Sequence, residues 1–197
     1  MSSASLVIAI VLALFARTFI IQAFDIPSGS MEPTLVPGDH ILVNKFIYGI
    51  RIPYSNIRMF TYKEPKRGDI IVFIYPKDPS KDFIKRVIGL PGETVQIIEG
   101  KIYIDNVPIP DPWGYFDKKE PPEFIAKVEN FGPVVVPKDS LFVMGDNRNN
   151  SDDSRFWGVL PLNNLVGKAF IIYFSWNSEA ENPLDKVRWS RTGELIR

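Results

Sequence analysis

Prolines and glycines recur along the whole chain, 17 and 13 among 197 residues, and they are spread out rather than clustered. Proline cannot donate to a helix or sheet ladder, and glycine weakens both, so long regular elements are interrupted repeatedly. Hydrophobic residues make up 45% of the sequence, so the short segments between these breaks can still build a core. We therefore expect a mostly β protein in which short strands alternate with turns.

Runs of β-branched, aromatic and aliphatic residues fill the intervals between these breaks, as strands require. The predicted strands cover Asp39–Tyr48, Ile70–Tyr75, Asp82–Ile88, Pro133–Pro137, Ser140–Met144 and Leu165–Trp176, and a hairpin joins Val95–Ile98 to Lys101–Ile104 around Glu99-Gly100. The run Ile70–Tyr75 is continuously apolar. This indicates burial on both faces, or one face on the core and the other on a membrane or ligand.

One apolar segment near the amino terminus has the length of a membrane span. Ala4–Phe24 contains a single charge, Arg17, and a helix of about 21 residues crosses a bilayer core of about 30 Å. A cleaved signal peptide is the competing interpretation, but no basic region precedes the apolar run. We therefore expect residues 1–24 to form a retained anchor helix, whose orientation the flanking charges do not determine.

The composition excludes several classes of function. The 23 basic and 23 acidic residues balance, which disfavours binding to nucleic acid. Cysteine is absent, which removes disulfides, thiol catalysis and thiolate metal sites. Because His40 is the only histidine, a zinc site would have to consist mostly of carboxylates, and we expect none.

Two polar stretches stand out against this apolar background. The first holds Ser28 and Ser30 between Pro27 and Pro33, and its simplest interpretation is a juxtamembrane linker. The second is the run from residue 145 to 155, which fails as a calcium loop. A solvated loop is its simplest interpretation, but apolar runs on both sides and the mixture of Asp, Arg and Ser side chains, which can pair with one another, argue against it.

Because the chain has no cysteine and one histidine, a nucleophilic mechanism would have to use serine or threonine. His40 could serve Ser30 in a conventional triad, and lysine is the other candidate base, because a desolvated ammonium loses its proton readily. In the strand Asp82–Ile88 only Lys85 could act in this way. The two basic residues of that strand, Lys85 and Arg86, could instead face water. Lys45 also has a partly apolar setting. The residue types alone leave this choice open.

Four sequence blocks, in this order after the apolar segment, carry a family resemblance. They are Ile26-Pro27-Ser28-Gly29-Ser30-Met31-x-Pro33-Thr34-Leu35 with Gly38-Asp39, then Arg67-Gly68-Asp69, then Ile84-Lys85-Arg86-Val87-x-Gly89-Leu90-Pro91-Gly92, then Gly145-Asp146-Asn147-Arg148-x-Asn150-Ser151-x-Asp153-Ser154-Arg155. Together they resemble bacterial type I signal peptidase, from the apolar segment to about Tyr173.

The resemblance implies specific roles for the polar residues. Ser30 would be the nucleophile and Lys85 the general base of a Ser-Lys dyad, with the Ser30 backbone N–H and the Ser28 hydroxyl as the oxyanion hole. Ser151 would orient the Lys85 amine, and Asp153, Arg155 and Arg148 would brace the loop. The substrate pockets would be formed by Phe24, Ile26, Pro27, Met31, Leu35, Ile41, Val72, Phe83 and Ile84.

The resemblance also implies a fold and an activity. We expect an antiparallel β-sheet catalytic core from residues 25–96 and 137–176, a small inserted β subdomain at 97–136, a tail at 177–197 packed on the core, and one transmembrane helix before them. The activity would be that of a membrane-bound serine endopeptidase that removes signal peptides after small-x-small sites such as Ala-x-Ala, without metal or organic cofactor. It would act at the bacterial cytoplasmic membrane, with the catalytic domain on the outer face.

Three alternatives stay beside this hypothesis. A soluble self-cleaving Ser-Lys protease of the repressor type shares the dyad but would not need Ala4–Phe24. A maturation peptidase dedicated to a conjugation or pilus substrate, and a membrane-anchored β domain that binds peptides without cutting them, are the other two. The expected partners are preprotein signal peptides and the lipid bilayer, with a secretion translocon as a further candidate and no nucleic acid.

Overall fold

Short strands are the main regular elements in the computed structural model, which describes residues 5–8, 20–51, 58–59, 62–116 and 128–197. The strands are β1 Ile21–Asp25, β2 Asp39–Asn44, β3 Ile50–Arg51, β4 Arg58–Met59, β5 Ile70–Ile74, β6 Asp82–Gly89, β7 Thr94–Ile98, β8 Lys101–Ile104, β9 Val107–Pro108, β10 Phe131–Val135, β11 Ser140–Met144, β12 Leu160–Pro161 and β13 Leu165–Ser175. Short helical turns complete them: η1 Gly29–Met31, α3 Ser154–Trp157, η2 Leu162–Asn164 and η3 Pro183–Asp185. The prediction of a mostly β protein is confirmed.

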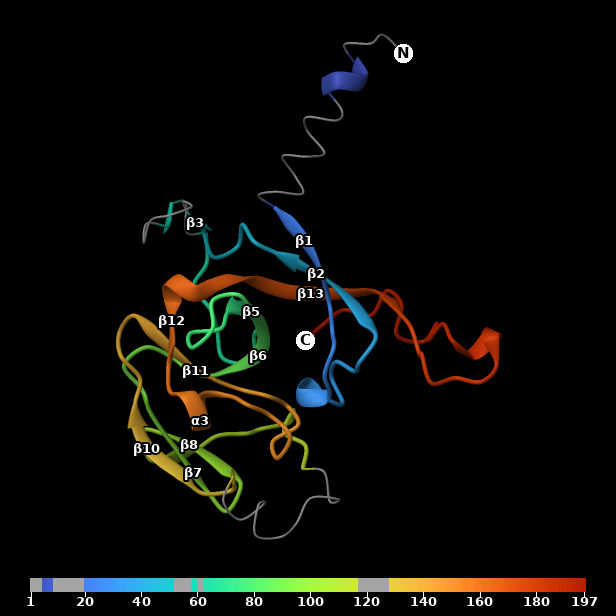
Figure 1. The fold of residues 1–197 in the computed structure, drawn as a ribbon. Coiled ribbons are helices and arrows are strands. Elements are labelled where there is room, and N and C mark those ends of the chain that lie inside the picture. Colours follow the sequence, from blue (N-terminus) through green and yellow to red (C-terminus); the bar gives the residue numbers. More distant parts are fainter. Residues whose placement is uncertain (1–4, 9–19, 52–57, 60–61, 117–127) are drawn as a thin grey trace.

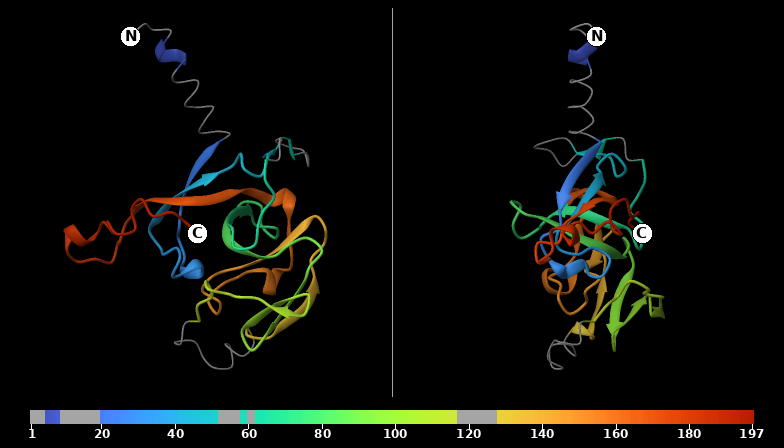
Figure 2. Two further views of the ribbon diagram at one scale, coloured as in Figure 1. Left: turned by 180° about the vertical axis from the view of Figure 1, so that it is seen from behind. Right: turned by 90° about the vertical axis from the view of Figure 1, so that its right-hand side faces the viewer.

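The strands form one large sheet and two smaller ones. The large sheet has seven strands in the order β1-β2-β13-β5-β6-β11-β12, and every neighbouring pair is antiparallel. A second sheet has the order β10-β7-β8-β9, and β3 pairs with β4. In Figure 1 the four-stranded sheet lies at the opposite end of the molecule from β1, and Figure 2 shows the same separation from two further sides.

The burial of β5 on both faces explains why its sequence is continuously apolar. Ile71 and Phe73 belong to one buried cluster, whereas Ile70 and Val72 belong to another, and all four are at most 2% exposed. The expectation of burial on both faces is confirmed. Because the second face packs against protein, it is not open to a membrane or a ligand.

The predicted hairpin is present in the four-stranded sheet. Strands β7 and β8 pair antiparallel, with Ile98 opposite Lys101. Glu99 and Gly100 have φ angles of 48° and 74°, the left-handed geometry that a tight two-residue hairpin needs. The expected boundary after Gln96 falls inside β7, because this strand already pairs with β8 from Val95 onward.

The amino-terminal segment differs from the expected anchor at its end. Residues 21–24 were predicted to be the last residues of a helix, but Ile21–Asp25 form β1, which pairs with β2 from Ile21 opposite Asn44 to Asp25 opposite His40. Alternating exposure and the packing of Phe24 against the core favour the strand. Residues 5–8 are helical, and the rest of the predicted span, at 4 and 9–19, lies outside the described residues. Within the described ranges, no helix combines the length and apolarity needed to cross a membrane.

The carboxy-terminal tail lies against β13. The Ile172 amide donates to the Glu194 carbonyl at 2.9 Å, and the Gly193 amide donates to the Ile172 carbonyl at 2.7 Å. Arg191 forms a salt bridge with Asp39, the first residue of β2. The tail, drawn in red in Figure 1, therefore reinforces the sheet that carries the site described next.

Candidate active site

The serine turn, residues 26–35, connects β1 to β2 and carries Ser30. Met31 and Leu35 are fully buried, so apolar side chains fix the turn on the core, while Ser30 faces a surface cleft. Ser28 is extended, with φ −135° and ψ 157°, and precedes η1. Because the first amides of a helix have no acceptor inside it, the Ser30 N–H near the start of η1 remains available to a ligand.

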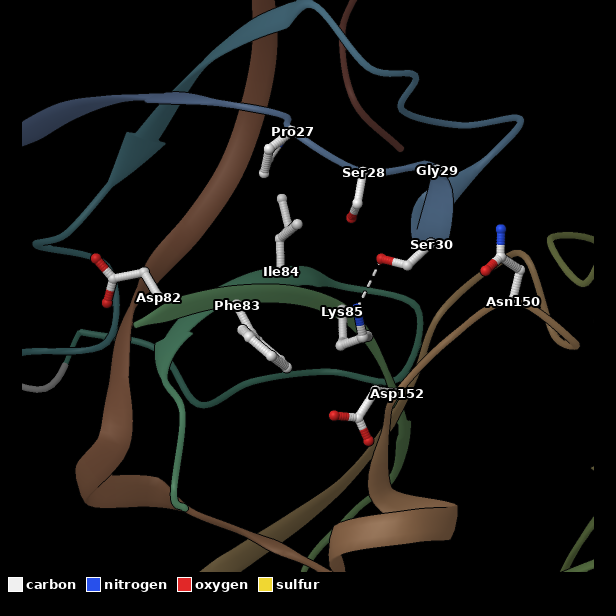
Figure 3. Close-up of a pocket in the computed structure, with 10 residues that line it drawn as sticks. All are labelled: Pro27, Ser28, Gly29, Ser30, Asp82, Phe83, Ile84, Lys85, Asn150 and Asp152. Atoms are coloured by element: carbon white, nitrogen blue, oxygen red, sulfur yellow. Dashed lines mark hydrogen bonds between the residues drawn. The ribbon is translucent and has the colours of Figure 1, made fainter. Parts of the chain in front are cut away.

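Strand β6 brings Lys85 to the serine turn. Its Nζ lies 2.8 Å from Ser30 Oγ, within hydrogen-bond distance, as the dashed line in Figure 3 marks. Lys85 is only 4% exposed, and this burial lowers its pKa from 10.5 to about 8. The nearby carboxylates of Asp153, Asp152 and Asp146 raise the pKa in the opposite direction but do not cancel the effect of burial. The site therefore contains an amine that can become neutral near physiological pH, next to a hydroxyl.

A cleft of about 300 Å³ surrounds this pair. Its lining residues are Pro27, Ser28, Gly29, Ser30, Asp82, Phe83, Ile84, Lys85, Asn150 and Asp152. Figure 3 shows the hydroxyl groups of Ser28 and Ser30 pointing into the space between the serine turn and β6. Asp82, Asn150 and Asp152 were not among the predicted site residues. Asn150 belongs to the recognised motif but had no assigned role, and nothing in the types of Asp82 and Asp152 distinguished them from surface polar residues.

The predicted pocket residues divide into two groups. Pro27, Phe83 and Ile84 line the cleft. The other six lie in or against the core cluster beneath it: Phe24, Ile26, Met31, Leu35, Ile41 and Val72. This second group therefore packs residues of the serine turn against strands β1, β2 and β5.

The polar loop, residues 145–155, holds the serine turn from the other side. The Asn147 amide donates to the Ser30 carbonyl, and its side-chain amide donates to the Gly29 carbonyl, each at 3.2 Å. A Cβ at Gly145 would overlap with Ser151 Oγ and with the Ser30 carbonyl oxygen, so the backbones approach too closely for a larger residue. Asn147 was part of the recognised motif, but the sequence did not indicate this contact.

The residues expected to brace the polar loop do so in part. Asp153 accepts from the Gly145 amide at 3.0 Å and forms a salt bridge with Arg155. Arg148 donates through Nε to the Gly145 carbonyl at 3.1 Å. Ser151 differs from expectation, because its buried hydroxyl has no hydrogen-bond partner within the described part of the chain, Lys85 included.

A buried ion pair joins the three segments of the site. Arg86, next to Lys85, contacts Asp146 through Nε at 2.8 Å and Nη2 at 2.6 Å, and both side chains are fully buried. Thr34, from the serine turn, donates to the same carboxylate at 2.6 Å. The possibility that both bases of β6 face water is therefore wrong. Neighbouring residues of a strand point to opposite faces, and here both faces are buried at Lys85 and Arg86.

His40 does not belong to this site. Its Nδ1 lies 2.5 Å from Asp25 Oδ1, and its ring contacts Tyr173 and Phe174. The cleft lining does not include it. The conventional triad that the residue types left open is therefore not assembled in this structure.

Known proteins with sequences similar to that of this chain share one description. The family model described as "Signal peptidase, peptidase S26" matches residues 2–176. A signal peptidase I from Pseudomonas aeruginosa is 40% identical over 195 residues, covering 84% of this chain and 69% of that protein. A signal peptidase I from Aquifex aeolicus is 38% identical over 236 residues, covering 91% and 88%. A crystal structure of a signal peptidase I from Enterococcus faecalis V583 is 32% identical with a TM-score of 0.45, covering 54% of this chain and 97% of that one.

The family model and the two sequence relatives confirm the family that the sequence motifs indicated. The matched region contains the serine turn, β6 and the polar loop, the three segments that meet at the cleft. The chain therefore belongs to the signal peptidase I family, peptidase S26, the serine endopeptidases that remove signal peptides from preproteins.

Proposed function

We propose that this protein cleaves preproteins with Ser30 as the nucleophile and Lys85 as the general base. The observation that carries the proposal is the 2.8 Å contact between Ser30 Oγ and the buried Lys85 amine, whose pKa is lowered to about 8. A lysine accepts a proton only in its neutral form, and burial makes that form accessible near neutral pH. Arg86 could not replace it, because a guanidinium keeps its proton.

The reaction follows from this arrangement. Ser30 Oγ transfers its proton to the neutral Lys85 amine and bonds to the scissile carbonyl carbon, which gives a tetrahedral oxyanion. When the peptide bond breaks, the Lys85 ammonium returns the proton to the leaving nitrogen of the mature protein. A water molecule then gives a proton to Lys85 and attacks the ester, which releases the signal peptide and restores the Ser30 hydroxyl.

Two donors are in position to stabilise the oxyanion. The Ser28 hydroxyl points into the cleft beside Ser30 (Figure 3), and the Ser30 amide near the start of η1 has no acceptor within that turn. Removing one such donor lowers kcat by about 10²- to 10³-fold in other serine proteases. Ser28→Ala should therefore retain the fold and lose activity by a factor of this order.

The free part of β6 suggests how the substrate binds. β6 pairs with β5 from Asp82 to Arg86, but β11 pairs with β6 only from Arg86 onward. The other edge of residues 82–85 therefore has no strand partner in the described ranges, and an extended peptide could pair with it. Pro27 and Ile84 line the cleft there, and family membership supports a preference for small side chains at the cleaved site, as in Ala-x-Ala.

The test is cleavage of a purified preprotein that carries an Ala-x-Ala site, followed by mass spectrometry of the products. Wild type should cut at this site, whereas Ser30→Ala and Lys85→Ala should both be inactive. His40→Ala is the matched control and should keep wild-type activity, because His40 pairs with Asp25 outside the cleft. Cleavage by either dyad variant at the wild-type rate would exclude the assignment.

We also propose that the protein works at the bacterial cytoplasmic membrane as a single-pass protein, with the catalytic domain on the outer face. Family membership and the apolar sequence of residues 4–24 support this location. Leu6, Val7 and Ile8 are 53–60% exposed, which is costly in water. In spheroplasts, an external protease should digest the catalytic domain. Full protection, or recovery in the soluble fraction after lysis, would contradict the proposal.

A further inference from the structure

Residues 111–116, which we call the latch segment, extend from the small sheet to the polar loop. The Tyr115 amide donates to the Asp146 carbonyl, and the Arg148 amide donates to the Tyr115 carbonyl, both at 2.7 Å. Tyr115 thus forms a parallel bridge with Asn147. These two hydrogen bonds join Tyr115 to the main chain of Asp146 and Arg148. Asp146 and Arg148 flank Asn147, whose amide donates to the Ser30 carbonyl.

A side-chain ion pair fixes the same junction. Asp111 contacts the Arg148 guanidinium with both carboxylate oxygens, and Arg148 Nη2 lies 2.7 Å from Asp111 Oδ1. Arg148 is 1% exposed, so the pair is shielded from water on the arginine side. A Cβ at Gly114 would overlap with both partners, which shows how closely the latch segment covers them. Bidentate Arg–carboxylate pairs fix orientation as well as distance.

The latch segment also covers the base strand. The Arg86 guanidinium lies 4.6 Å from the Trp113 ring centre, in cation–π geometry. Arg86 follows Lys85 in β6 and pairs with Asp146 of the polar loop. One short segment therefore touches the residue next to the proposed base and the loop that holds the proposed nucleophile.

We propose that the latch segment is a positioning element for catalysis, in which Asp111 and the Tyr115 main chain set the geometry of Ser30 and Lys85 through the polar loop. The path is short: Asp111 holds Arg148, Arg148 Nε holds the Gly145 carbonyl at 3.1 Å, and the Asn147 amide holds the Ser30 carbonyl at 3.2 Å. The proposal rests on the proposed Ser30–Lys85 dyad. No residue of the latch segment lines the cleft, so it acts through other residues and not on the substrate.

Loosening the polar loop should change two measurable quantities. A small displacement of Ser30 lowers kcat, because a shift of about 1 Å can cost about 100-fold in rate. Water that reaches Lys85 raises its pKa back toward 10.5, so that less of the amine is neutral at a given pH. KM should change less than kcat, because no residue of the latch segment lines the cleft.

Two matched pairs of variants test the proposal on the full-length enzyme. Tyr115→Pro removes the amide that donates to Asp146, whereas Tyr115→Ala keeps it and removes only a side chain that is 43% exposed. Asp111→Asn replaces one of the two carboxylate oxygens that accept from Arg148 by an amide NH₂ and removes the negative charge, so the ion pair is lost. Asp105→Asn makes the same change of charge at an exposed aspartate of the same subdomain, where an asparagine oxygen can still accept from the Thr94 amide.

We expect Tyr115→Pro and Asp111→Asn to lower kcat by about 10- to 100-fold and to move the acidic limb of the pH profile of kcat/KM upward by about one pH unit. Both controls should stay within about twofold of wild type. Near-UV circular dichroism at the assay temperature identifies the variants that are folded. The proposal is overturned by a folded latch variant with the kcat of its control, or by one whose acidic limb does not move.

Ser30→Ala in the same assay separates this inference from the proposed function. If Ser30→Ala still cuts at the wild-type rate, the dyad is wrong and the latch proposal falls with it. If Ser30→Ala is inactive while the folded latch variants match their controls, the dyad stands and only the role of the latch segment is refuted.

Discussion

Replacing Lys85 by methionine should make the folded protein more stable at neutral pH while abolishing cleavage. Burial lowers the pKa of Lys85 from 10.5 to about 8, because the folded structure disfavours the charged ammonium. At neutral pH the ammonium is nevertheless the main form, so the native state carries a desolvated charge. Methionine has a similar length and no charge, and its thioether suits the apolar side of the site.

The magnitude follows from the two pKa values. Each pKa unit corresponds to about 1.4 kcal/mol, so the difference between 10.5 and about 8 destabilises the native state by about 3 kcal/mol. The sign depends on proton binding. Between pH 8 and 10.5 the unfolded chain binds more protons at this position than the native state does, so the stability of wild type rises with pH over that range. This destabilisation of the native state has its full size of about 3 kcal/mol below pH 8, and it falls below about 1 kcal/mol at pH 10.

The assay is urea unfolding of wild type and Lys85→Met, followed by the fluorescence of the four tryptophans at several pH values. The variant should be more stable by about 3 kcal/mol at pH 7, and this difference should shrink by about 2 kcal/mol at pH 10. A packing difference between the two side chains is the same at every pH, so the pH dependence isolates the charge. A difference that stays constant from pH 7 to 10 would refute the reasoning that Lys85 is held as a desolvated amine.

Three further predictions concern the same site. In wild type, kcat/KM should fall about tenfold per pH unit as the pH drops below about 8, because Lys85 becomes protonated, and a flat profile from pH 8 to 6 would contradict this. Arg86→Met should lower the free energy of unfolding by about 3–5 kcal/mol in a urea titration, because it leaves the buried Asp146 carboxylate without its partner; a loss below about 1 kcal/mol would mean that the pair behaves as a surface contact. Gly145→Ala should reduce kcat by about 100-fold with an unchanged far-UV spectrum, because its Cβ would push the polar loop away from Ser30, and full activity would show that the close approach is unnecessary.

Local sequence predicted much of the fold, because strand formation here depends on short-range patterns. Apolar runs between prolines and glycines placed β5, β6, β11 and β13 to within one or two residues. The same reasoning was wrong at residues 21–24, where a run of apolar residues suited both a membrane helix and an edge strand. Pairing with β2 decides between the two, and the sequence of a single segment does not contain that information.

The sequence alone was enough to assign the family and to list the residue types available for catalysis: two serines beside a glycine, lysines in apolar strands, no cysteine and a single histidine. Which of these residues meet depends on the tertiary structure. Ser30 and Lys85 are separated by 55 positions along the chain, yet Nζ and Oγ are 2.8 Å apart. His40 lies elsewhere, six predicted pocket residues lie in or against the core, and Asp111, which had no recognisable signal, contacts the polar loop. The physical reason is that the pKa of an amine and the depth of a cleft depend on which distant side chains exclude water, whereas local sequence specifies mainly the conformation of the backbone.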